Sequence, residues 1–154
     1  QWLDEHQDHT WSLARFLLQD SREAEDVTQE VFIKLWQHRE GIDPSRVRFW
    51  LMRVTRNNCL DRLRRRQQES ELDDNLPGGE VGPAEGLQRS ETGKWLHAAI
   101  ARLAEPFRSV VILRDVQQHS YQDVAGITGL SMPQVKTYLH RARKQLREHL
   151  VEVQ

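Results

Sequence analysis

Arginine and lysine side chains, which bind phosphate groups well, gather in two separate segments of the chain. Residues 46–66 hold eight basic residues and one acid, and residues 132–150 hold five basic residues and one acid. Two acidic segments alternate with them: residues 1–45 hold ten acids and four bases, and residues 67–93 hold seven acids and one base. Because phosphate binding depends on the local field, this pattern indicates a protein that binds nucleic acid at two places.

The second basic segment has the spacing of a helix-turn-helix. Ser120 is predicted to cap a short helix, Gly129 to form the turn, and Ser131 with Gln134 to cap the next helix as a capping box. In this motif the second helix enters the major groove. The polar residues outside its apolar stripe are predicted to contact DNA, although any surface helix can be polar and basic: Gln134, Lys136, Thr137, His140, Arg141 and Lys144.

The first basic segment combines aromatic rings with arginines. Rings that stack on bases, beside arginines that neutralise the backbone, are a common way to hold single-stranded nucleic acid. Two alternatives stay open: Trp50 alone fits a hydrophobic core better than a stacking site, and the arginines also fit a solvated helix face. The residues predicted to contact a single strand are Trp50, Arg53, Arg56, Asn57, Asp61, Arg62, Arg64 and Arg65.

Other polar groups give weaker signals. Acids near the start of a helix are expected from the helix dipole alone, and two histidines without a third partner are more typical of a surface than of a metal site. No phosphate loop, nucleophile elbow or Ser/His/Asp arrangement is present, so we expect no metal, no cofactor and no enzyme activity. The groups considered are Glu25, Asp26, Glu30 and Lys34, and His6 and His9 beside Asp8.

Apolar residues recur every three to four positions in both halves of the chain, which predicts helices and no strands. The expected fold class is all-α, with two small helical domains at residues 1–68 and 94–154. Residues 69–93 hold five of the eight glycines and read as a flexible acidic linker that leaves the domain orientation open. The first domain is predicted to have three helices, ending near residues 20, 38 and 67. The second is a four-helix domain, with one helix from Pro106 to about residue 118 and the helix-turn-helix last.

Composition limits the class of protein further. The chain has 154 residues and a net charge of −1, so bulk charge indicates no partner. No apolar run approaches the roughly 18 residues of a membrane span, and no signal segment opens the chain. Cys59 is the single cysteine, which excludes an internal disulfide framework. We expect a cytoplasmic protein without membrane insertion.

Three motifs in order resemble bacterial RNA polymerase sigma factors of the sigma-70 family, in the extracytoplasmic-function (ECF) group. Residues 25–32 read EDVTQEVF and precede Lys34, Leu35 and Trp36. The second motif lies within residues 50–66, and the third runs from Ser120 to Arg143. Three ordered motifs are more specific than any one of them.

The resemblance implies a role for each motif. The first would dock on the clamp region of core RNA polymerase through Asp26, Gln29, Glu30 and Lys34. The second would read the melted minus-ten promoter element, with the 39–46 loop capturing a flipped base. The third would read the double-stranded minus-thirty-five element. Such factors are commonly silenced by an anti-sigma factor.

The expected function is therefore promoter-specific transcription initiation by binding, with no small-molecule substrate. Two alternatives remain open from the sequence. One is a helix-turn-helix repressor or activator with a helical sensor domain, and the other is a helical adaptor that does not bind DNA. Association with core polymerase would distinguish a sigma factor from both alternatives.

Overall fold

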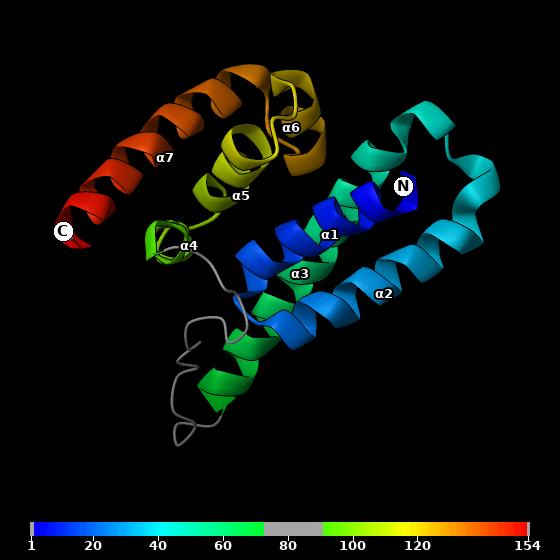
Figure 1. Ribbon diagram of the computed structural model, residues 1–154, viewed down its shortest axis with the longest axis horizontal. Coiled ribbons are helices and arrows are strands. Elements are labelled where there is room, and N and C mark those ends of the chain that lie inside the picture. Colours follow the sequence, from blue (N-terminus) through cyan, green and yellow to red (C-terminus); the bar gives the residue numbers. More distant parts are fainter. Residues whose placement is uncertain (1, 73–90, 154) are drawn as a thin grey trace.

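A computed structural model describes residues 2–72 and 91–153, and these residues form helices and short connections without any strand, which confirms the all-α class. The N-terminal half packs three helices side by side (Figure 1). They are α1 (Trp2–Leu18), α2 (Ser21–His38) and α3 (Val47–Leu72), and two 3₁₀ turns (Arg39–Gly41 and Pro44–Arg46) join α2 to α3.

A sharp turn lets α2 fold back against α1. Gln19 adopts a positive φ of 58°, and the Asp20 carboxylate accepts hydrogen bonds from the backbone N–H groups of Arg22 and Glu23 at 2.9 and 3.2 Å. Such a cap satisfies amide groups that have no partner inside the helix. The predicted start of this helix at residue 21 is confirmed.

Helix α3 is longer than predicted. It continues through residues 69–72, and the next described helix already includes residues 91–93, so both ends of the predicted 69–93 linker are helical. Gln, Glu and Leu after the arginine cluster are good helix formers and explain the extension. The remaining part of the predicted linker, residues 73–90, lies outside the described residues.

The C-terminal half contains α4 (Glu91–Ala101), α5 (Phe107–Val111), a π-helical segment η3 (Ile112–Val116), α6 (Tyr121–Thr128) and α7 (Met132–Val153). The predicted single helix from Pro106 to about residue 118 is thus divided and ends earlier. Its last turn widens because the Gln117 N–H bonds to the Ile112 carbonyl, five residues back, at 2.9 Å.

The helix-turn-helix prediction is confirmed in detail. Ser120 Oγ accepts from the Asp123 N–H at 3.1 Å, and Gly129 ends α6 with a φ of 78°. Ser131 and Gln134 form the reciprocal capping box, with bonds of 2.9 and 3.2 Å. These caps end α6 and begin α7 at the residues that the sequence predicts.

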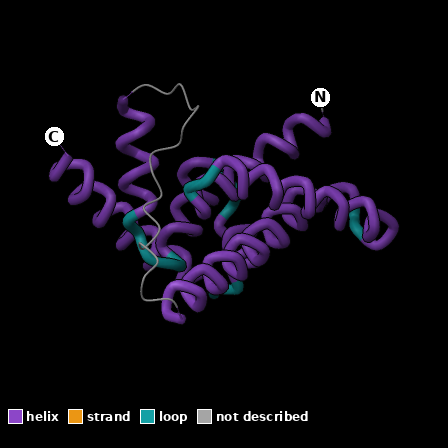
Figure 2. Tube along the Cα trace, turned by 90° about the horizontal axis from the view of Figure 1, so that it is seen from below, coloured by secondary structure: helices purple, strands orange, loops and turns teal. Residues whose placement is uncertain are grey.

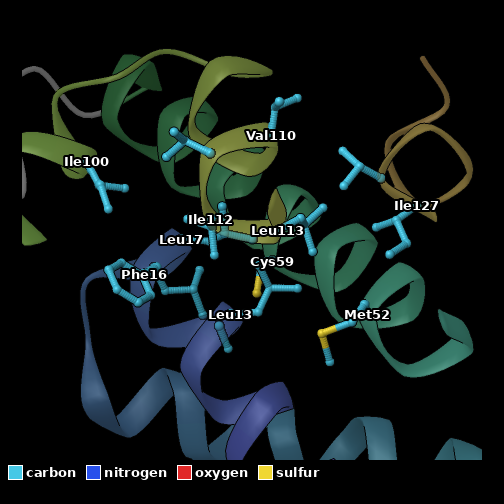
Figure 3. Close-up of a cluster of buried hydrophobic side chains, with 14 of the residues drawn as sticks. Leu13, Phe16, Leu17, Met52, Cys59, Ile100, Val110, Ile112, Leu113 and Ile127 are labelled. Atoms are coloured by element: carbon cyan, nitrogen blue, oxygen red, sulfur yellow. The ribbon is translucent and has the colours of Figure 1, made fainter. Parts of the chain in front are cut away.

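The two halves share one hydrophobic core, a placement that the sequence left open. Figure 3 shows Leu13 and Leu17 of α1 close to Ile112 and Leu113 of η3, with Cys59 of α3 beside them, and all five are buried. Figure 2 shows the C-terminal helices lying against the N-terminal bundle. Burial raises the pKa of the Cys59 thiol to about 12, so this cysteine is unreactive at neutral pH.

Polar groups also cross this boundary. Arg108 donates to the Leu17 carbonyl at 3.3 Å, and the Gln117 amide donates to the His9 carbonyl at 2.9 Å. His119 lies beside them, with its ring centroid 6.4 Å from that of His9. The Leu17 carbonyl lies in the last turn of α1, where backbone carbonyls lack partners within the helix, whereas the His9 carbonyl lies in the middle of α1.

We expect His119 to make folding stability sensitive to acid. Burial, and then the nearby His9, lower the pKa of His119 from 6.5 to about 4. The unfolded chain therefore binds this proton more readily, and stability present above pH 6.5 is lost as the pH falls towards 4. Between pH 6.5 and 4, the free energy of unfolding measured in urea should fall by about 1–3 kcal/mol more for the parent than for His119→Gln. Parallel stability curves for the two proteins would contradict the assignment.

Candidate nucleic-acid interface

The last helix presents one polar face to solvent. Val135, Leu139 and Ala142 of α7 are buried against the rest of the C-terminal half. All six residues predicted to contact duplex DNA are exposed on the other side of the helix. The face is therefore free to enter a major groove, and it consists of Gln134, Lys136, Thr137, His140, Arg141 and Lys144.

Neighbouring side chains of α7 serve the fold instead. Arg143 forms a two-pronged ion pair with Asp115 at 2.9 and 2.6 Å, which ties α7 to η3. Tyr138 packs edge-on against Phe107 with a centroid distance of 5.3 Å. Neither Arg143 nor Tyr138 was predicted to contact DNA, and in the structure both side chains attach α7 to the rest of the C-terminal half.

A groove of about 550 Å³ runs between α2 and α3. It brings together five of the eight residues predicted to contact a single strand, together with two of the residues predicted to contact polymerase. Positive, aromatic and amide groups share the surface, a combination that can hold bases and phosphates together. The lining residues are Glu30, Lys34, His38, Trp50, Val54, Asn57, Asn58, Asp61, Arg62 and Arg65.

Hydrogen bonds fix the floor of this groove. Glu30 of α2 accepts from Arg62 at 2.7 Å and from Asn58 at 2.9 Å. The Trp50 ring is half-buried against the core and lies 6.2 Å from the His38 ring, so it serves as both core and groove wall. The two interpretations of Trp50 are therefore compatible.

The other three predicted residues of α3 lie elsewhere. Arg53 and Arg64 are exposed outside the groove. Arg56 is only 8% exposed and points into the boundary between the two halves. Because only residues three or four positions apart share a face of a helix, α3 cannot present all eight predicted residues on one face. Arg56 therefore does not line the groove.

Helix α2 carries a second hollow on its side towards α1. It has a volume of about 500 Å³, and Ile33 and Trp36 on its wall are 58% and 68% exposed. The sequence analysis did not predict this hollow. The signal for it was the presence in α2 of apolar residues, Ile33 and Trp36, outside the stripe that forms the core. Gln7, Thr28, Gln29, Phe32, Ile33 and Trp36 line this apolar hollow.

The four residues predicted to contact polymerase lie on two different sides of α2. Gln29 lines the apolar hollow, whereas Glu30 and Lys34 line the groove on the α3 side. Asp26 is exposed near the start of the helix. The residues predicted to contact polymerase therefore lie immediately beside the groove that contains residues predicted to contact single-stranded DNA.

The 39–46 loop is held by short-range contacts. The Arg39 guanidinium lies 4.0 Å from the Trp36 ring centroid. Asp43 accepts from the Ser45 N–H and hydroxyl at 3.0 and 2.9 Å, and these bonds hold the pKa of that carboxyl below its usual value. These contacts all join residues within three positions of one another.

The described residues, 2–72 and 91–153, contain no cluster of three or more metal-binding side chains. No helix within these ranges is long and apolar enough to cross a membrane. The fold and the two surfaces define a two-part helical protein with a helix-turn-helix and a basic, aromatic groove.

Comparison with known proteins gives the family. Residues 2–69 match the family described as Sigma-70 region 2, and residues 93–146 match Sigma-70, region 4. The chain belongs to the sigma-70 family of RNA polymerase sigma factors, whose members are not enzymes.

Individual relatives carry ECF names. The chain is 33% identical to the ECF RNA polymerase sigma factor SigE of Mycolicibacterium smegmatis, over 96% of this chain and 60% of that protein. It is 30% identical to the ECF RNA polymerase sigma factor SigM of Bacillus subtilis, over 86% of this chain and 85% of SigM. The sigma factor RpoE from Bartonella quintana, solved in complex with the anti-sigma factor NepR, matches with a TM-score of 0.85 and 26% identity, over 97% and 94% of the two chains.

Proposed function

We propose that this chain is an ECF sigma factor that binds core RNA polymerase and directs promoter-specific transcription initiation. The observation that carries the proposal is the presence of region 2 and region 4 in one chain and in that order. Polymerase supplies the chemistry, and this chain supplies recognition. Because its partner polymerase works in the cytoplasm, the chain would act there too.

The α7 face would read the minus-thirty-five element as double-stranded DNA. Its amide, hydroxyl, imidazole and basic groups suit both base edges and phosphates. Lys136 of α7 also lies 6.0 Å from the ring centroid of Tyr121, the first residue of α6. Support comes from the full exposure of this face and from the two caps that fix its direction.

The groove between α2 and α3 would hold the melted minus-ten element. Trp50 offers a ring for stacking, and Asn57 offers an amide that can pair with a base edge. Arg62 and Arg65 supply positive charge for the backbone, and Glu30 orients Arg62 through their 2.7 Å bond. Base contacts of this kind would favour the opened strand over the duplex.

Polymerase would dock on the other exposed side of α2. Asp26 and Gln29 are polar and exposed there, and the apolar hollow with Ile33 and Trp36 offers area to bury. Aromatic residues at the centre of an interface with charges around it form a common arrangement. In this assignment Glu30 and Lys34 serve the DNA groove as well as the rim of the docking surface.

An anti-sigma factor is a further proposed partner. The RpoE relative of known structure was solved with such an inhibitor bound. The similarity to RpoE over almost the entire length of both chains supports an inhibitor of this class here.

Duplex binding gives a direct test of the α7 assignment. We expect Lys136→Ala and Arg141→Ala each to weaken binding to a minus-thirty-five duplex by about 1–3 kcal/mol where a base contact is lost, and less where only a phosphate contact is lost. Fluorescence anisotropy at several salt concentrations separates the two cases, because only phosphate contacts change the salt slope.

The control is Arg147→Ala, which removes an exposed positive charge from the same helix outside the predicted face. If Lys136→Ala and Arg141→Ala bind with the affinity and salt slope of the parent, then α7 does not occupy the groove.

A further inference from the structure

The ring of Tyr121, at the start of α6, lies beside two cations from neighbouring elements. The ring is half-buried and packs against the hydrophobic core. The Arg114 guanidinium of η3 lies 4.5 Å from the ring centroid, and the Lys136 ammonium of α7 lies 6.0 Å from it. Both distances lie within the range of cation–π attraction. One aromatic ring therefore joins three consecutive elements of the C-terminal half.

The Tyr121 ring has a fixed place before any partner binds. Arg114 is half-buried, and its Nη1 donates to the His119 carbonyl at 2.9 Å, in the turn that precedes α6. The Ser120 cap holds the backbone at the start of the same helix. Because the backbone, the guanidinium and the core all hold the ring, Lys136 is the member of this group that can move.

Lys136 has few other restraints. It is exposed, and its ammonium ends a flexible four-carbon chain with many rotamers. Within residues 2–72 and 91–153 no carboxylate pairs with it, whereas Arg143 on the same helix is engaged by Asp115. The ring of Tyr121 is thus the group that restricts the direction of Lys136.

This restriction matters for base recognition. A lysine that neutralises a phosphate acts as a point charge and tolerates several directions. A lysine that distinguishes guanine from other bases must place its ammonium at the O6 and N7 acceptors in the major groove. Ordering the side chain before binding also reduces the entropy that is lost on binding.

We propose that Tyr121 is a positioning residue: its ring directs Lys136 towards a base edge and so sets the base preference of α7 at one position of the upstream element. The proposal rests on the proposed function. Arg114 keeps the ring in place, and Lys136 makes the contact. The competing interpretation is that Tyr121 contacts DNA itself through its hydroxyl group.

Three changes at position 121 separate these interpretations. Tyr121→Leu keeps an apolar side chain against the core but removes the ring, and Tyr121→Phe keeps the ring but removes the hydroxyl. A phenylalanine with three ring fluorines at this position keeps the shape of the ring and weakens the negative face that attracts the cation. Tyr138→Leu is the matched control, because it removes the other tyrosine of the chain, which packs on Phe107.

Base preference is measured with the chain bound to core polymerase, on a duplex library that is randomised in the upstream element. The bound fraction is sequenced, and the position that Lys136 contacts is the one where Lys136→Ala loses its preference. Thermal unfolding checks that each variant is folded, and the fluorinated ring gives the result if Tyr121→Leu is not.

We expect Tyr121→Leu and the fluorinated ring to lower the preference at that position about two- to fivefold, the scale of a cation–π contact near a surface. Tyr121→Phe and Tyr138→Leu should keep the parent preference. In the Lys136→Ala background, Tyr121→Leu should cause no further loss at this position, because its effect passes through Lys136.

Parent-like preference in both the Tyr121→Leu and the fluorinated chain would overturn the proposal, as would unchanged preference in Lys136→Ala. An equal loss in Tyr121→Phe would assign the effect to the hydroxyl, and an equal loss in Tyr138→Leu would assign it to a general disturbance of α7. Both results would also overturn the proposal. A parent chain that does not associate with polymerase, or that selects no sequence, would remove the proposed function and this proposal together. A selective parent with an unaffected Tyr121→Leu would remove only the role of Tyr121.

Discussion

Replacing Asn57 with alanine is expected to lower open-complex formation about tenfold while leaving binding to the closed promoter unchanged. Asn57 is exposed in the groove between α2 and α3, where its amide can pair with a base edge. A lost base contact costs about 1–3 kcal/mol. Closed-complex binding depends on α7 in this account, so it should survive. Permanganate reactivity of unpaired thymines on a linear promoter measures the opening.

The control for Asn57→Ala is Gln67→Ala, an exposed amide on the same helix outside the groove. A promoter with a pre-melted bubble adds a second comparison. Because the groove is assigned to capture of the strand, the Asn57→Ala defect should persist on the bubble. Normal opening by Asn57→Ala, on the linear promoter and on the bubble, would mean that Asn57 does not contact the opened strand.

Reversing the charge of Asp26 is expected to weaken association with core polymerase at least about tenfold, on the scale of a lost interfacial charge pair. Asp26 is exposed near the start of α2 and is the cleanest probe of this surface. Glu30 is a poorer probe, since it also holds Arg62 and Asn58 and its reversal would disturb the groove. Affinity is measured by titrating labelled chain with core polymerase.

Glu148→Arg provides the matched control for Asp26→Arg. It makes the same change of charge at an exposed position of α7, in the other half of the protein. Duplex binding by Asp26→Arg should equal that of the parent, because α7 is untouched. Parent-like affinity of Asp26→Arg for polymerase would remove the acidic start of α2 from the docking surface.

Local rules predicted the helix-turn-helix well. Ser120, Gly129 and the Ser131–Gln134 box act through bonds to backbone groups within four residues, so the sequence contains the whole interaction. The exposure of the six α7 residues follows from the apolar stripe of Val135, Leu139 and Ala142. Where both partners of an interaction lie in one short segment, periodicity and capping are sufficient.

Arg56 shows why the remainder of the site could not be predicted. Its acceptors Ser109 and Glu105 lie more than forty positions away and belong to the other half. Charge and spacing alone grouped it with Arg62 and Arg65, because nothing in α3 marks one arginine as buried. Its burial depends on how two helical units meet, which residue patterns within either unit do not encode. For the same reason, the close contact between the Phe49 ring of α3 and Gly126 of α6 could not be predicted from the sequence.

The central claim, that this chain directs transcription initiation, is tested most directly by run-off transcription with core polymerase on a promoter library. With the parent chain, transcripts should start at defined sites downstream of shared upstream and downstream elements. With Lys136→Ala the upstream element should lose its influence, and with Asn57→Ala initiation should fall at every site. Transcripts that match those of core polymerase alone, from a chain that still binds duplex DNA, would contradict the account.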